Sequence, residues 1–298
     1  MAPALPISPS NPKSGHEARL ASRNGTLLNP TCGAAPGYLQ ANLIILPSAY
    51  APDFQLLCTR NPVPCPLLAT SSVPGDFTNL TSFLPGIAGT AIASNLDIRT
   101  DAPLYNVYHN GTLISTRVPD LKNHWDTNSH VAFLIGCSYS FETALCAAGL
   151  PPPHQLHSRN VSMYRSNLPL NPAGIFTASN YVVSMRMYSP RDLEKIRSIT
   201  RPYVATHGEP VAWGWDGARA IGITDVNRVD WGDAPVLPSG EAVVHGQGEC
   251  IPVFWGCGVT PQEAVMRAEI PGTVMGHEPG YMLVLDVKEE EILNEKGK

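Results

Sequence analysis

Two short segments of this chain share a pattern of residues that could bind an anion. Residues 136–145 (GCSYSFETAL) and 256–265 (GCGVTPQEAV) each follow an apolar run and lead into a helical pattern. Each copy therefore predicts a strand, a tight turn and a helix. Glycine lets the backbone approach a ligand closely, and the free N–H groups at a helix start attract anions. We expect the two segments, here called the first and second corners, to converge on a shared cavity. A repeated unit that only packs is the alternative.

The two corners start their helices with different residues. In the second corner Thr260 can cap the helix, Pro261 suits its first position and Glu263 can complete a capping box. In the first corner Ser140 takes the capping position. Glu142 then falls in the first turn, where a carboxylate favours the positive end of the helix dipole.

A cysteine precedes the helix start in both corners. This position can lower the pKa of a thiol, so Cys137 and Cys257 are candidate thiolates. Two thiolates that face one carbon atom would suit a cofactor-independent racemase or epimerase. The alternative for each cysteine is a structural role as a small buried hydrophobic residue.

The composition narrows the class of protein. With 298 residues, 43% hydrophobic and 15% charged, the chain can bury a sizeable core. A net charge of -5 argues against nucleic acid as a partner, and no apolar run has the length of a membrane span. Seven unevenly spaced cysteines indicate a reducing compartment. We therefore expect the cytoplasm, with the mitochondrial matrix as second choice.

Strand patterns alternate with helix patterns along the chain, which predicts an α/β (mixed α+β) fold. We expect a single compact domain over residues 13–287, built from two intertwined strand-turn-helix repeats. It would follow a disordered lead-in at residues 1–12 and precede a charged tail at 288–298. The local patterns predict a helix over 15–23, a long surface loop over 69–95, a half-buried strand over 96–101, a hairpin over 105–118, and core strands over 181–186, 220–223 and 281–285.

Nine further motifs stand in one order along residues 15–287: APGYLQANL (35–43), DIRTD (97–101), FLIGCSYSFE (133–142), NVSMYRSN (160–167), VVSMR (182–186), THG (206–208), DWGD (230–233), PVFWGCGVTPQ (252–262) and HEPG (277–280). Together they resemble the "putative hydro-lyase" family, which also forms one domain of mitochondrial D-glutamate cyclase. The resemblance implies a lyase that removes water. For the cyclase relative, the reaction interconverts D-glutamate with 5-oxo-D-proline and water. The chain departs from the family pattern at Ala212-Trp213 and at Tyr281, where histidines are usual.

Such a reaction needs cations for two carboxylates, a base and an acid. Arg99, Arg165 and Arg186 lie in motifs where each guanidinium should pair with a carboxylate, either of the substrate or of an internal Asp or Glu. The remaining candidates for substrate binding are polar residues of the motifs: Asn42, Ser138, Ser140 and Thr260.

For proton transfer we expect Glu142, His207 and Asp233, with Cys137 and Cys257 as the alternative catalytic pair. Each of the first three could instead have only a local structural role.

We expect no metal and no nucleotide cofactor. His154 and His157 stand beside three prolines, which predicts a surface loop with solvated histidines, and no Gly-rich dinucleotide fingerprint follows a strand. The expected partner is a small carboxylate substrate, with a homo-oligomer possible. A binding protein for an acidic metabolite, without catalysis, is a further alternative.

Overall fold

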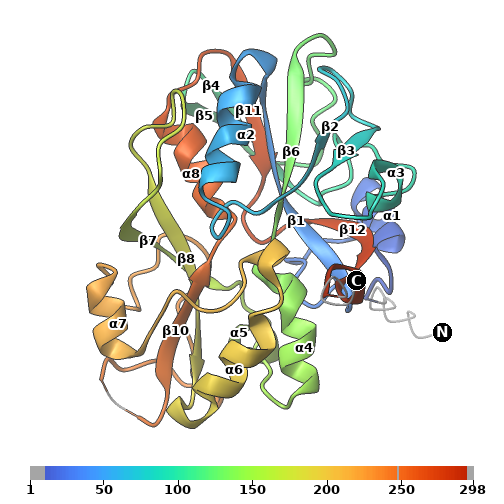
Figure 1. Cartoon of the computed structure of the whole chain (residues 1–298). Coiled ribbons are helices and arrows are strands. Elements are labelled where there is room, and N and C mark those ends of the chain that lie inside the picture. Colours follow the sequence, from blue (N-terminus) through green and yellow to red (C-terminus); the bar gives the residue numbers. More distant parts are fainter. Residues whose placement is uncertain (1–10, 247, 294–298) are drawn as a thin grey trace, which may run out of the picture.

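The apolar stretches of the sequence form two antiparallel sheets (Figure 1). The computed structural model describes residues 11–246 and 248–293. Most of the predicted lead-in, residues 1–10, and the end of the predicted tail, residues 294–298, lie outside the described residues. In the described part, no helix is both long and apolar enough to cross a bilayer.

The larger sheet is built around β1 (Tyr38–Pro47), which is buried along nearly its whole length. Its order is β3-β2-β6-β1-β11-β4-β5, and β12 also pairs with β1. The other strands are β2 (Leu67–Ser71), β3 (Leu80–Ser82), β4 (Tyr105–His109), β5 (Thr112–Val118), β6 (His130–Gly136), β11 (Thr273–His277) and β12 (Leu283–Lys288). Alternate side chains of β1 enter two different hydrophobic clusters, as the pleat of a strand requires.

The smaller sheet has the order β7-β8-β10-β9. Its strands are β7 (Ser162–Pro169), β8 (Asn180–Tyr188), β9 (Ala212–Trp213) and β10 (Ile251–Gly256). The helices of the described residues are α1 (Gly15–Arg23), α2 (Ala51–Arg60), α3 (Gly89–Ile92), α4 (Glu142–Ala147), α5 (Pro153–Leu156), α6 (Leu193–Thr200), α7 (Gly214–Ala220), α8 (Val259–Arg267) and α9 (Glu289–Leu293). The short helices α4, α5 and α6 lie together beside the smaller sheet (Figure 1). Four single 3₁₀ turns are η1 (Ser48–Tyr50), η2 (Ser138–Phe141), η3 (Pro190–Asp192) and η4 (Val204–Thr206).

Each sheet contains one copy of the repeat, and the two copies match in their hydrogen bonds. In the first corner β6 leads into η2 and α4, and the Ser140 hydroxyl accepts a hydrogen bond from the Gln40 amide of β1 at 3.0 Å. In the second corner β10 leads into α8, and the Thr260 hydroxyl accepts one from the Val182 amide of β8 at 2.9 Å. A hydroxyl at the same place in each corner thus braces the neighbouring strand. The mixed α/β fold built from two repeats is confirmed.

Several local predictions agree with the structure. The helix over 15–23 is α1, the hairpin over 105–118 is formed by β4 and β5, and the core strand over 181–186 lies within β8. The predicted strand over 281–285 appears two residues later, as β12. The first residues of the predicted tail form the end of β12 and the helix α9.

Three other local predictions are wrong. Residues 96–101 form turns instead of a strand, because the Asp97 carboxylate accepts a hydrogen bond from the Arg99 amide two residues later. Ala220 is the last residue of α7, and residues 221–223 form the turn that ends the helix, where Gly222 has a positive φ of 84°. The predicted loop over 69–95 contains β3 and α3, and it begins within β2, which pairs with β6.

Candidate active site

The two corners meet at buried side chains, and the amides of their capping residues are already hydrogen-bonded. Cys137 and Cys257 share one buried hydrophobic cluster, and both are only 7% exposed. Asn42 links the corners: its amide donates to the Gly136 carbonyl at 3.0 Å, and Gly258 packs so closely on it that an added Cβ would lie 1.8 Å from Asn42 Nδ2. The amides of the two capping residues, Ser140 and Thr260, donate back within their own turns. The expectation that both corners present these amides to an anion is therefore wrong.

Burial also opposes the thiolate hypothesis. Desolvation raises the pKa of Cys137 far above its ordinary value and raises that of Cys257 to about 11. Backbone N–H groups of Tyr139 and Val259 point at the two thiols, but they do not offset the burial. The two residues are thiols near neutral pH, and this structure does not favour a two-thiolate racemase.

The three predicted arginines all have carboxylate partners within the chain. Arg99 forms two hydrogen bonds of 2.9 Å with Asp97, outside the corners. Arg165 binds Glu263 at 2.8 Å and Asp230 at 2.5 Å. Of the three, only Arg186 joins the first corner, where its guanidinium lies 2.5 Å from Glu142 and 3.0 Å from the Ser138 hydroxyl, which accepts its hydrogen bond.

The predicted proton-transfer residues are not brought together. His207 is buried at a left-handed φ of 87°, with Nδ1 2.8 Å from the Val63 carbonyl, and burial lowers its pKa to about 4. Asp233 is exposed, and its carboxylate accepts a hydrogen bond from the Asn160 amide at 2.7 Å. Glu142 lies in a separate group of side chains, with Cys32 and His154.

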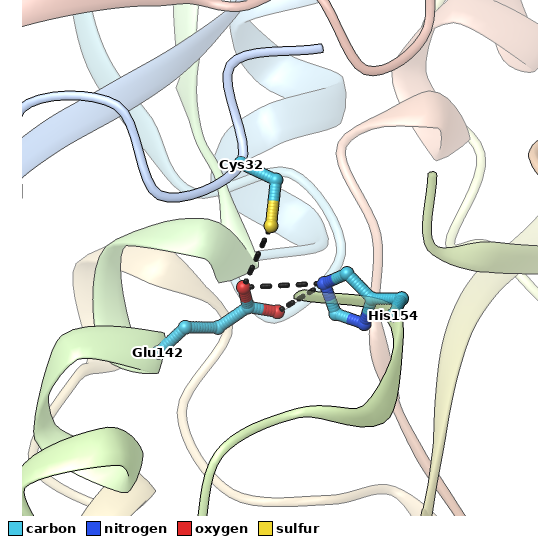
Figure 2. A group of neighbouring side chains, drawn as sticks. All are labelled: Cys32, Glu142 and His154. Atoms are coloured by element: carbon cyan, nitrogen blue, oxygen red, sulfur yellow. Dashed lines mark hydrogen bonds and ion pairs between the residues drawn. The ribbon is translucent and has the colours of Figure 1, made fainter. Parts of the chain in front are cut away.

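Glu142 is the centre of a buried polar cluster, which we define as Cys32, Glu142 and His154 (Figure 2). His154 Nε2 lies 3.2 and 3.3 Å from the two Glu142 oxygens, and the Cys32 thiol points at Oε2 from 3.4 Å. Arg186 holds the other oxygen, Oε1, while Gln155 donates to Oε2 at 3.3 Å. Glu142 is fully buried, so it depends on these partners for its charge.

The electrostatics of the cluster fix Glu142 as an anion. Burial alone would raise its pKa, but His154 and Arg186 together outweigh burial, so the pKa lies below its ordinary value. The pKa of the neighbouring Cys32 shifts in the opposite direction. Burial, followed by the charge of Glu142, raises its pKa well above the ordinary value. Near neutral pH the cluster therefore pairs a carboxylate with a protonated thiol.

The cluster lies at the wall of a cavity of about 610 Å³ between residues 11–32 and residues 154–159. Cys32, His154 and Gln155 line it, together with Arg159. The Arg159 guanidinium has no hydrogen bond or ion pair within residues 11–246 and 248–293, and its Nε is buried without a partner there. The described residues that line this cavity include no Asp or Glu, and the charge of Glu142 behind Cys32 and His154 is already paired with Arg186, so an anionic ligand would meet the free cation of Arg159.

Comparisons with known proteins identify the family of this chain. Residues 131–286, which contain both corners, match the family model described as D-glutamate cyclase. The chain belongs to the D-glutamate cyclase family. Among curated relatives, proteins named "Putative hydro-lyase" are 44% identical in Schizosaccharomyces pombe (91% of this chain, 83% of the relative), 45% in Bordetella pertussis (92% and 89%) and 44% in Rubrobacter xylanophilus (92% and 96%). Among solved structures, a nitrogen repressor-like protein from Methanococcus jannaschii is 10% identical, covers 90% of this chain and 93% of its own and has a TM-score of 0.36.

This member of the D-glutamate cyclase family has a second large cleft, of about 470 Å³, beside the second corner. It is lined by the carboxylates Asp233, Glu263 and Glu278 and by Arg117, which lies 3.5 Å from Glu278. Glu263 is paired with Arg165 and Arg267, and Arg117 is paired with Glu278, so the described lining of this cleft presents no unpaired cation to an anion, unlike the cavity at the first corner. Tyr281, one of the departures from the family pattern, also lines this cleft.

The sequence analysis missed Cys32, His154 and Arg159. It placed His154 in a solvated loop, whereas the residue is only 7% exposed because α5 folds back and brings it against Glu142. Gly149 allows this return of the chain, with a positive φ of 78° after α4. The sequence did contain one indication of the cluster: His154 follows the candidate catalytic residue Glu142 by only twelve residues.

Proposed function

We propose that the chain is a lyase that removes water from a small dicarboxylate, with D-glutamate and 5-oxo-D-proline as substrate and product. The observation that carries the proposal is the cavity at the first corner, where the unpaired Arg159 stands beside the Cys32–Glu142–His154 cluster. Membership of the D-glutamate cyclase family and the names of the relatives support the same class of reaction.

The reaction makes three demands on the site. The amine nitrogen attacks the side-chain carboxyl carbon and forms a C–N bond, while a C–O bond breaks and the oxygen leaves as water. The ammonium nitrogen must lose two protons in all, and the departing oxygen must gain two protons to leave as water, so the reaction needs a base and an acid. The substrate must also be held in a geometry that favours ring closure.

Residues of the cavity would bind the substrate and activate its side-chain carboxyl. Arg159 would bind the α-carboxylate, because a guanidinium forms paired hydrogen bonds with a carboxylate. The Cys32–Glu142–His154 cluster would supply the electrophile at the side-chain carboxyl, since it lies in the wall of the same cavity. Arg186 would keep Glu142 charged and fixed without touching the substrate.

The test is direct. Purified protein is incubated with D-glutamate, L-glutamate and 5-oxo-D-proline, and the products are measured by mass spectrometry as the loss or gain of one water. We expect interconversion of D-glutamate and 5-oxo-D-proline. Inertness toward both, and toward small hydroxy acids, would contradict the proposal. Thermal stabilisation by D-glutamate without turnover would show a binding protein instead of an enzyme.

A matched pair of variants links the activity to the cavity. We expect Arg159→Met to lower kcat/KM by about 100-fold, which corresponds to the loss of one charge-assisted carboxylate contact. Arg228→Met, at an exposed arginine with no ion pair in the described part of the chain, should retain wild-type kinetics. Equal kinetics for the two variants would remove Arg159 from the site.

A further inference from the structure

We propose that Cys32, Glu142 and His154 bind a divalent metal ion of the zinc class, with its open coordination position facing the cavity of about 610 Å³. This inference rests on the proposed function and deepens it by naming the electrophile of the site. The three ligand atoms lie within 4.8 Å of one another (Figure 2).

The separations inside the cluster are close to those between ligands of one ion. The thiol lies 3.4 Å from Glu142 Oε2, and His154 Nε2 lies 3.2 and 3.3 Å from the two Glu142 oxygens. A tetrahedral zinc ion, with bonds of about 2.3 Å to sulfur and 2.0 Å to nitrogen and oxygen, holds its ligand atoms about 3.3–3.5 Å apart.

The donor set also fits. Sulfur, imidazole nitrogen and carboxylate oxygen are the three kinds of atom that proteins use for zinc, and catalytic zinc sites have three protein ligands and one open position. Cys32 and His154 both line the cavity, so the open position would face the space that a substrate enters.

Arg186 fixes the orientation of Glu142 from behind. It binds Oε1, while Oε2 faces Cys32, His154 and the Gln155 amide, as a hydrogen-bonded metal ligand does. An incoming ion would displace the thiol proton of Cys32, because only the thiolate is a strong ligand. Glu142, the thiolate, Arg186 and a divalent ion then sum to one positive charge, which suits a dicarboxylate substrate.

The ion would act as a Lewis acid. Coordination of a side-chain carboxyl oxygen at the open position would draw electrons from its carbon, which the amine then attacks, and would stabilise the oxygen as it leaves. This chemistry gives the cluster the task that the proposed function assigns to it.

The experiment uses the full chain without a histidine tag, freed of metal by a chelator and titrated with Co²⁺ and Zn²⁺. We expect one ion per chain by elemental analysis, about one proton released per ion at neutral pH, and a cobalt–thiolate charge-transfer band in the near ultraviolet. Cys32→Ser should abolish that band, and His154→Gln should weaken binding at least tenfold. Cys146→Ser is the matched control, because its thiol bonds to Gln155 outside the ligand set, and it should bind as the wild type does.

The outcomes separate the two proposals. No thiolate band, or a band that survives in Cys32→Ser, overturns the metal site. Full turnover by metal-free protein also overturns it, while the proposed function stands. Stoichiometric binding that requires Cys32 and His154, without turnover of D-glutamate or 5-oxo-D-proline, supports the metal site and contradicts the proposed function.

Discussion

The two corners have the same backbone framework and different charges. In each, a hydroxyl braces the adjacent strand, Ser140 in the first corner and Thr260 in the second. The corners differ in the residue two positions after this hydroxyl. Glu142 lies there in the first corner and forms a buried ion pair with Arg186, whereas Gln262 lies there in the second. The comparison shows that the duplicated unit provides position, and that each copy places its carboxylate differently: Glu142 pairs with Arg186 inside the protein, whereas Glu263 of the second corner pairs with the more exposed Arg165 and Arg267.

Each of these side chains also touches a histidine, and the two histidines differ in access. His154, beside Glu142, lines the cavity at the first corner. His277 lies 3.1 Å from the Gln262 amide nitrogen and from the Leu43 amide, and burial lowers its pKa to about 4. The first corner therefore combines a charged acid, a histidine and a cavity. At the matching place in the second corner, the neutral Gln262 and His277 hold strands together.

The largest expected difference between the corners is in stability. Glu142→Gln leaves the fully buried Arg186 without its anion, which should lower the free energy of unfolding by about 3–5 kcal/mol. Gln262→Ala removes neutral hydrogen bonds and should cost about 1–2 kcal/mol. Urea denaturation of both variants measures the contrast. Equal losses would mean that the corners do not differ in the way their charges indicate.

A second buried carboxylate, Glu289, has its pKa shifted in the opposite direction to that of Glu142. Glu289 packs beside Tyr203 with no cation as its partner in the described part of the chain, and burial raises its pKa to about 7. The folded protein then holds a proton that the unfolded chain releases above its ordinary pKa of 4.5. Stability from this group is therefore present below pH 4.5 and is lost as the pH rises toward 7.

We expect the wild type to lose about 2 kcal/mol relative to Glu289→Gln between pH 5 and pH 8. Denaturation of both proteins at the two pH values measures this difference. A difference that stays constant with pH would show that Glu289 is ionised in the folded protein at both values.

The smallest expected effect tests the shared framework. Ser140→Ala and Thr260→Val each remove one acceptor from a buried strand amide and should lower the free energy of unfolding by about 1 kcal/mol in both corners. The measurement is again urea denaturation. A loss confined to one of the two variants would contradict the structural equivalence of the corners.

The sequence predicted the framework better than the site, for physical reasons. The corners, the hairpin at 105–118 and the strand at 181–186 depend on local patterns of apolar, glycine and capping residues, so they were correctly predicted. The partner of each arginine depends on which elements pack together. Arg186 meets Glu142 only because β8 lies beside the first corner, 44 residues away along the chain.

The same reason explains why the cluster was missed. Three prolines before His154 indicate an irregular segment, but nothing local shows that this segment packs against α4. Cys32 reaches the cluster from 110 residues before Glu142, a distance that sequence periodicity does not cover.

A structure of the protein with bound 5-oxo-D-proline tests the central claim most directly, because it decides between the two large cavities. We predict that the ligand carboxylate lies within hydrogen-bonding distance of the Arg159 guanidinium, with the ring directed at Cys32 and His154. Ligand bound instead beside Arg117 and Glu278, in the cleft of the second corner, would contradict the assignment of the active site to the first corner.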